Sequence, residues 1–147
     1  MPRYENSDVS FDVPRDWEDR SVVAFAAPPE PGQTAAASVV MTRDALAAGE
    51  DFRRYGDRQL LELAKRLEGF QLLARHERAI GDRPALELRF AWRGQSGPLE
   101  QRLLFVPGRR PIVLSFTATI PKDEAARLDP VFDRIFASVR IAGSPDG

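Results

Sequence analysis

Few residues in this 147-residue sequence have the chemistry of a catalytic group, and they lie far apart along the chain. The only histidine, His76, stands in the segment L-L-A-R-H-E-R-A-I, whose charged neighbours are typical of an exposed strand. Asp16, Glu18 and Asp19 are close together, but they follow a proline in a turn and have no histidine beside them, so we interpret them as a solvated turn. Ser96 lacks the G-x-S-x-G sequence of a hydrolase nucleophile. We therefore predict no enzyme, no metal site and no other cofactor.

The composition narrows the possible partners. There is no cysteine, which excludes disulfides and thiolate zinc sites. The 21 basic and 22 acidic side chains alternate along the chain and give a net charge of −1, whereas a nucleic-acid-binding domain needs a basic face.

The longest stretch without a charge, residues 31–42, is shorter than the about 20 apolar residues of a membrane span. The first residues have no apolar core of a signal peptide. We expect a cytoplasmic protein that binds no nucleic acid and does not insert stably into a membrane.

The hydrophobic pattern predicts one domain over residues 1–142, followed by a disordered tail over 143–147. Helical spacing predicts one helix over 49–67 and a second that has Asp129 as its cap and Pro130 at its first position. Alternation and β-branched residues predict strands over 10–13, 21–27, 36–43, 70–80, 85–93, 99–106 and 111–120.

The order of these elements is β-β-β-α-β-β-β-β-α. Clear turn sequences separate the last four strands, so we expect them to form an antiparallel meander. The simplest arrangement is an α+β fold with a single antiparallel β-sheet and two helices packed on one face.

Two of the predicted strands depart from the pattern of such a sheet, whose open face should be polar. One side of these strands carries the large residues Phe25 and Met41, and we expect it to face the core. The other side carries no charge; its residues are Val22, Ala24, Ala26, Ser38, Val40 and Thr42. Either a second layer of the chain or a dimer partner covers this side, or it is a groove for an apolar ligand. A later strand has a similar apolar side, formed by Leu99, Gln101, Leu103 and Phe105, in which the Gln101 amide can donate and accept hydrogen bonds.

Several segments also carry a recognisable pattern: F-D-V-P-R-D-W-E-D-R-S-V-V-A-F at 11–25, S-V-V-M-T-R-D at 38–44, Y-G-D-R-Q-L at 55–60, L-E-G-F at 67–70, L-E-Q-R-L-L-F at 99–105 and R-R-P-I-V-L-S-F-T-A-T at 109–119. With them, nearly the whole chain resembles the DcrB-related family of small domains, whose fold is PsbP-like. Within that family it is most similar to the effector-associated (Eag) chaperones of bacterial type VI secretion systems.

This resemblance implies a homodimeric cytoplasmic chaperone. Such a protein binds the N-terminal transmembrane helices of an effector, shields them from water and assists loading onto the spike protein, which it meets indirectly through the effector. The positions that the resemblance implies for binding are Val22, Ala24, Ser38, Val40, Thr42, Gln59, Leu67 and Gln101. Family members often have a larger aliphatic residue in place of Ala24. Either Gln101 or Leu103, two residues apart on one side of a strand, occupies the position of a family glutamine.

Two other functions compete with this one. Other proteins of the same fold suggest an envelope-associated PsbP-like structural or ligand-binding protein without catalysis, which would have to be exported. A small enzyme that uses Asp16, Asp19 or His76 would instead have a polar pocket around those groups.

Overall fold

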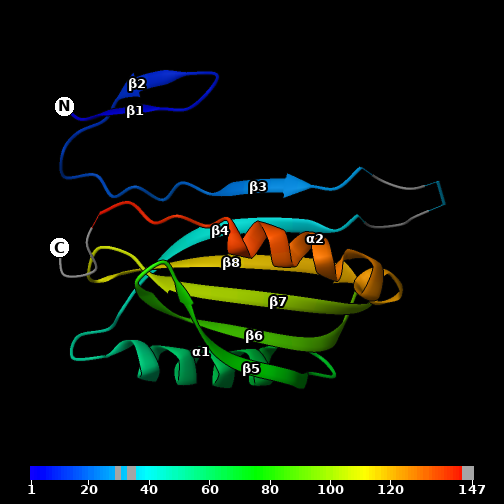
Figure 1. Ribbon diagram of the computed structural model, residues 1–147. Helices are drawn as coiled ribbons and strands as arrows, with labels where there is room; N and C mark the ends of the chain where they lie inside the picture. Colours follow the sequence, from blue (N-terminus) through cyan, green and yellow to red (C-terminus); the bar gives the residue numbers. More distant parts are fainter. Residues whose placement is uncertain (29–30, 33–35, 144–147) are drawn as a thin grey trace.

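The body of the protein is a six-stranded antiparallel sheet with the strand order β3-β4-β8-β7-β6-β5 (Figure 1). The computed structural model describes residues 1–28, 31–32 and 36–143. Its elements, in chain order, are β1 (Arg3–Glu5), β2 (Ser10–Asp12), β3 (Val23–Ala26), β4 (Ser38–Ala45), α1 (Phe52–Arg66), β5 (Gln71–Ile80), β6 (Arg83–Gly94), β7 (Gly97–Pro107), β8 (Ile112–Pro121), the short 3-10 helix η1 (Lys122–Glu124) and α2 (Ala125–Ala137).

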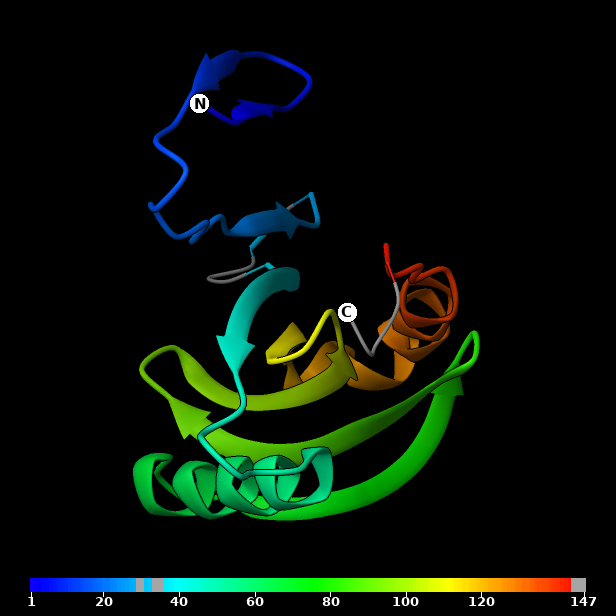
Figure 2. The same cartoon turned by 90° about the vertical axis from the view of Figure 1, so that its left-hand side faces the viewer.

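The two helices pack on opposite faces of this sheet, which corrects the expectation that both lie on one face. Alternate residues of β7 belong to different cores: Leu103 and Phe105 pack in the cluster with α1, whereas Leu104 and Val106 pack in the cluster with α2. Figure 2 shows the two helices on either side of the curved sheet. The central strands are apolar on both sides, so each face needs its own cover. The α+β class and the antiparallel meander are confirmed.

The described strands form two sheets, which corrects the expectation of a single sheet. Strand β1, which the sequence pattern did not reveal, pairs only with β2, and the two form a separate two-stranded hairpin. A strand of three residues, Arg3–Glu5, is too short to show a period. The other predicted strands agree with β3 to β8 to within three residues at each end, as does the predicted helix over 49–67 with α1.

The second helix begins earlier than predicted. Helix α2 starts at Ala125 with Glu124 at its N-cap, so Asp129 is not the cap and Pro130 lies inside the helix. The reason is that η1 leads directly into α2, and the buried stripe already begins with Ala125 and Leu128. Of the expected tail, only Gly143 is described, and its carbonyl accepts a hydrogen bond from the buried Arg83. Residues 144–147 lie outside the described residues.

Helix α1 is attached close to one half of its sheet face. Asp51 caps its N-terminus by accepting a hydrogen bond from the Arg54 N–H at 2.8 Å. A Cβ atom at Gly56 would lie 2.5 Å from Cδ2 of Leu86 on β6, so glycine permits this close approach. Neither helix in the described part of the chain is long and apolar enough to cross a bilayer. Because α1 packs mainly over β6 and β7, much of β3, β4 and β8 on the same face stays uncovered.

Candidate functional site

A continuous part of the α1 side of the sheet, covered beside α1 and open toward the edge strand β3, carries no charged side chain on four neighbouring strands. Residues opposite one another in an antiparallel sheet point to the same face. The register therefore places three rows across the strands, and we call their residues the uncharged face: Ala24, Val40, Thr117 and Leu103 in the first row, Ala26, Ser38, Thr119 and Gln101 in the second, and Thr42, Ser115 and Phe105 in the third.

Burial across the uncharged face falls from α1 toward the edge of the sheet. Leu103 is buried beside α1, Val40 and Thr117 are half-buried, and Ala24 on the edge strand is exposed. Small side chains fill the outer part of the face. A long apolar partner could therefore approach the backbone of β3 and β4 closely.

A chain of hydrogen bonds crosses the second row. The indole Nε1–H of Trp92 donates to Oε1 of Gln101 at 2.8 Å, and Nε2 of Gln101 donates to Oγ1 of Thr119 at 2.8 Å. Ser38 lies opposite Thr119 on the next strand. These contacts fix the orientation of the Gln101 amide and leave its second amide hydrogen available to a partner.

Helix α1 borders the face with one flank. Tyr55 lies on that flank, because its hydroxyl donates to Oδ2 of Asp44 at the end of β4 at 2.8 Å. Gln59, one turn later, follows on the same side and is half-buried. Leu67, which ends the helix, packs against the same apolar cluster as Leu103.

One end of the uncharged face opens into a cavity of about 620 Å³. Thr119 and Trp92 line it together with Leu99, and it is also lined by charged side chains of both signs, Arg66, Glu68 and Arg93. The uncharged face therefore ends beside charged side chains of both signs.

The residues predicted for binding are largely brought together. Ala24, Ser38, Val40 and Thr42 share one face of the adjacent strands β3 and β4, as the alternation predicted, and Gln101 on β7 points to the same face beyond β8. Gln59 and Leu67 lie on α1 at its border, and Val22, 62% exposed, immediately precedes β3. Leu103 is on the same side as Gln101, so the register does not choose between them for the family glutamine. Their role in binding stays a prediction.

The expected core position of Phe25 is wrong, since this side chain is 70% exposed. Strand β3 is the edge of the sheet and has no neighbouring strand on its outer side. Met41, one strand further in, is half-buried on the same side.

Four residues of the site were not singled out from the sequence, namely Ser115, Thr117 and Thr119 on β8 and Trp92 on β6. The alternation of Ser115, Thr117 and Thr119 was a usable signal for these three. Trp92 could be found only from the structure, in which it pairs with Leu99 and its indole reaches Gln101.

The candidate catalytic residues do not form a site together. His76 is exposed on β5, and Ser96 lies in the turn between β6 and β7. Hydrogen bonds from the Ser21 hydroxyl and N–H hold the pKa of Asp19 below its usual range, and Arg43 lies 3.5 Å from the same carboxylate. Across the described residues, no three potential ligands lie together in a way that could hold a metal ion.

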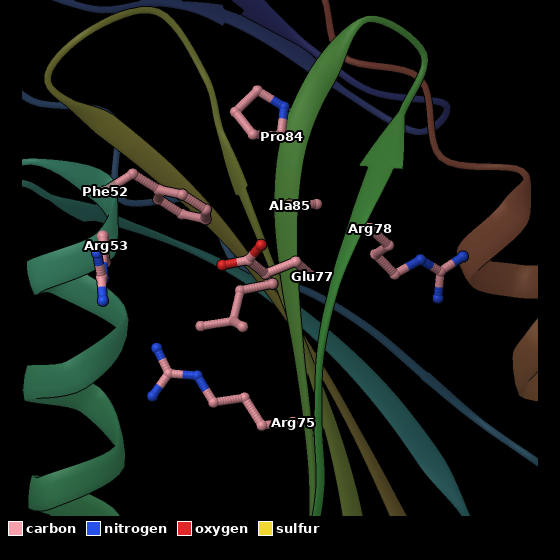
Figure 3. Close-up of a pocket in the computed structure, with 8 residues that line it drawn as sticks. Phe52, Arg53, Arg75, Glu77, Arg78, Pro84 and Ala85 are labelled. Atoms are coloured by element: carbon pink, nitrogen blue, oxygen red, sulfur yellow. The ribbon is translucent and has the colours of Figure 1, made fainter.

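A different hollow, of about 430 Å³, lies on the other flank of α1 (Figure 3). Phe52 and Leu86 form its apolar part, and Arg53, Arg75 and Glu77 bring charge to it. The Arg75 guanidinium is 2.8 Å from Asp57. Its mixed charges distinguish this hollow from the uncharged face.

Comparison with known proteins identifies relatives over almost the whole chain. The DcrB family model matches residues 8–138. A Pseudomonas aeruginosa protein named Effector EagT6 is 30% identical over 123 residues, which cover 84% of this chain and 85% of EagT6. The crystal structure of PA94, a protein of unknown function from Pseudomonas aeruginosa, has a TM-score of 0.84 and 28% identity and covers 98% of this chain and 99% of that one.

A more distant likeness concerns the fold alone. Cyanobacterial PsbP from Synechocystis has a TM-score of 0.56 at 10% identity, with 95% of this chain and 91% of that chain covered. LpqN of Mycobacterium tuberculosis, described as involved in cell envelope biogenesis, has a TM-score of 0.51 at 16% identity, with 79% and 81% covered. The protein thus has a PsbP-like fold, and on the match over residues 8–138 it belongs to the DcrB family.

Proposed function

We propose that this protein is a cytoplasmic homodimeric chaperone for a type VI secretion effector. It binds and shields the effector's N-terminal transmembrane helices and assists loading onto the spike protein, which it meets through the effector. The observation that carries the proposal is the uncharged face, which spans four strands beside α1 and is partly exposed. The similarity to EagT6 and the family resemblance of the sequence support the same function.

The chemistry of the face suits a helix that is itself apolar. Ala24, Val40 and Thr117 offer methyl groups and small hydroxyls in one row, with no charge that an apolar partner would have to desolvate. Small side chains let a helix approach closely, so dispersion contacts accumulate along its length. Such packing depends more on the shape of the helix than on the identity of its side chains. The face could therefore bind helices of varied sequence.

The second row adds hydrogen-bonding side chains to this otherwise largely apolar surface, and these can orient a bound helix. Gln101 is held by Trp92 and Thr119, and its free amide hydrogen can donate to a hydroxyl or a backbone carbonyl of the helix. Gln59 provides a second amide from the flank of α1. Polar atoms of a transmembrane helix that stayed unpaired in this setting would be costly, so both amides favour helices that carry such atoms.

The free energy gained by burying apolar surface is large enough for tight binding on an open face. Shielding about 1,000 Å² of apolar surface yields roughly 25 kcal/mol before costs. Loss of rigid-body freedom and ordering of side chains remove much of this gain. A deep pocket is therefore unnecessary.

Co-expression with an effector's apolar N-terminal segment tests the proposal. The wild-type protein should keep the segment soluble and co-purify with it. Ala24→Asp places a carboxylate on an exposed position of the face and should abolish co-purification, and the combination of Val40→Asp with Gln59→Ala should do the same. Leu61→Asp is the matched control, because it also places a carboxylate at an exposed apolar position, which is 55% exposed and lies on α1 outside the uncharged face. It should behave as the wild type. Equal solubility of the segment without the chaperone, or with Ala24→Asp, would show the proposal to be wrong.

A further inference from the structure

Strand β5 is the second edge of the six-stranded sheet, at the opposite end from β3, and among the described strands it pairs with β6 alone. It has ten residues, whereas β3 has four. A free edge presents a row of unpaired backbone N–H and C=O groups, onto which an extended peptide can add as a further strand. The pairing with β6 is irregular only between Leu72 and Ala74, so residues 74–80 form a regular edge for such an addition.

The hollow of about 430 Å³ on the outer flank of α1, here called the charged hollow, lies beside this regular edge. Glu77 of β5 is opposite Leu86 of β6, which packs in the cluster with α1. Glu77, and Arg75 two residues before it, therefore point to the α1 side of the sheet. Figure 3 shows both side chains reaching from β5 toward α1, where Phe52 and Arg53 stand. A strand added to β5 would direct alternate side chains into the charged hollow.

The floor of the charged hollow is apolar. Leu86 is 4% exposed, and the half-buried Phe52 packs against the same cluster. Pro84 and Ala85 continue the apolar lining toward the turn between β5 and β6. The volume lies within the range of about 300–1,000 Å³ that is typical of ligand pockets. An apolar side chain of a bound segment therefore has a place to pack.

Two cations of the charged hollow are available to a ligand. Arg53 is exposed and makes no ion pair within the described part of the chain. The ion pair with Asp57 at 2.8 Å holds the Arg75 guanidinium in place and uses only one of its two terminal nitrogens. Arg78 is instead paired with the buried Glu87 at 2.6 Å. Arg53 and Arg75 can therefore bind a carboxylate of the ligand through charge-assisted hydrogen bonds.

The exposed Glu77 restricts where that carboxylate can lie. Glu77 also makes no ion pair within the described residues, so its charge is not compensated locally. On an added strand, an acidic residue is attracted opposite Arg75 and repelled opposite Glu77. The two positions are two residues apart on one side of β5, so the matching pattern is an acidic residue followed or preceded, two positions away, by an apolar one.

We propose that β5 and the charged hollow bind an extended acidic segment of a partner protein, which adds to the sheet as a further strand. The main chain of this segment pairs with the free edge of β5, an apolar side chain packs on Phe52 and Leu86, and a carboxylate binds Arg53 and Arg75. The site is at the opposite edge of the sheet from β3 and on the other flank of α1 from the uncharged face. The inference therefore does not depend on the proposed function.

NMR titration of the isotope-labelled, full-length protein with three blocked peptides tests the inference. In the acidic peptide, TLTETLTET, the leucine and glutamate side chains share one face. The basic peptide, TLTKTLTKT, reverses the charge. The third is the acidic peptide N-methylated at two successive central residues, which removes a backbone N–H on each side of the strand. The acidic peptide should shift the backbone amide signals of residues 74–80 and saturate below about 1 mM, and the other two should bind at least about tenfold more weakly.

Charge variants locate the contact. Arg53→Glu should raise the Kd of the acidic peptide at least about tenfold, because it replaces a cation of the site with a carboxylate. Arg54→Glu is the matched control, since it makes the same charge change at the next residue of α1, which is exposed and does not line the charged hollow. It should change the Kd less than about twofold. Glu77→Gln should lower the Kd about threefold by removing a like charge.

Several results would overturn the inference. They are the absence of saturable shifts in β5, equal binding of the basic or the N-methylated peptide, an equal loss from Arg53→Glu and Arg54→Glu, and a Kd that Glu77→Gln does not lower. None of them would bear on the proposed function, which depends on capture of the effector segment. Ala24→Asp separates the two sites, because it should abolish that capture and still bind the acidic peptide as the wild type does.

Discussion

The indole N–H of Trp92 donates to the side-chain oxygen of Gln101 across two neighbouring strands at 2.8 Å. The same amide donates to Thr119, so a single glutamine connects β6, β7 and β8 within the uncharged face. The two partners fix the positions of the amide oxygen and the amide nitrogen of Gln101. Its second amide hydrogen is therefore a donor for a ligand that covers the face.

Gln101→Ala should therefore weaken binding of an effector helix that carries polar atoms. Loss of one hydrogen bond is worth about 1 kcal/mol, so Kd should rise about fivefold. Binding of a helix made only of leucine and alanine should change much less, because such a helix has no polar side chain for the amide to meet. Titration of both peptides against both proteins measures the difference. An equal loss for the two peptides would contradict a hydrogen-bonding role.

Tyr55→Phe should lower stability without changing the sheet. The ring of Tyr55 is 1% exposed and packs edge-on against Phe105, and these contacts remain, but the hydrogen bond to Asp44 is lost. We expect a decrease of about 1 kcal/mol in the free energy of unfolding and a Tm lower by about 4 °C. The same substitution in an Asp44→Ala background should have almost no further effect, and full additivity of the two changes would exclude the bond.

The ion pair of Glu50 and Arg58 should make stability depend on pH in the acid range. Hydrogen bonds from the Arg58 guanidinium and the Ala47 N–H lower the pKa of Glu50 from 4.5 to about 2. A lowered pKa in the folded state stabilises the fold above the unfolded pKa, and this contribution disappears as pH falls from about 4.5 to about 2.

Glu50→Gln should accordingly be less stable than the wild type at pH 7, and the two should converge near pH 2. Thermal unfolding across this range measures the difference, with Glu62→Gln on the exposed side of α1 as a control. A difference between Glu50→Gln and wild type that stays constant from pH 7 to pH 2 would contradict the pKa.

A buried ion network attaches α2 to the opposite face. Glu87 accepts from Arg78 at 2.6 Å and from Arg102 at 2.9 Å, and Arg102 also lies 2.8 Å from Asp133 of α2. Burial opposes the charge of Arg102, but these carboxylates outweigh it and raise the pKa of the guanidinium. Arg102 and Glu87 are 3% and 4% exposed.

Glu87→Gln should lower the free energy of unfolding by about 3 kcal/mol, because it removes the buried counterion of Arg102 and leaves the exposed Asp133 as its nearest carboxylate. The more exposed pair of Arg89 with Asp129, at 3.0 Å, should contribute at most about 1 kcal/mol, so Arg89→Gln is the comparison. Urea unfolding of the two variants separates these effects. Equal losses would show that burial does not determine the strength of the network.

The sequence was sufficient for most of the elements, with the exceptions of β1 and the start of α2, but not for the placement of the helices. Period and turn chemistry located α1 and the meander, since these signals are local. The run L-L-F-V at 103–106, apolar at four successive positions, already indicated burial on both faces, and it is the physical reason that one helix covers each side.

Part of the candidate site could likewise be predicted from the sequence, and part depends on the three-dimensional arrangement. Ala24, Ser38, Val40 and Thr42 could be found because the absence of charge on alternate positions is visible in the chain. The partners of Gln101 depend on the register of β6, β7 and β8, and the exposure of Phe25 depends on the position of β3 at the edge of the sheet. Neither property is encoded locally.

The central claim is that the uncharged face binds an apolar helix, and fluorescence of Trp92 tests it most directly. The chain has two tryptophans, so Trp17→Phe leaves Trp92 as the only one. Titration with a peptide of about 20 residues from an effector's transmembrane segment should shift its emission to shorter wavelength and saturate at one peptide per chain. Ala24→Asp should remove the shift, and Leu61→Asp should preserve it. A peptide that co-elutes with the protein while Trp92 emission stays unchanged would contradict the account.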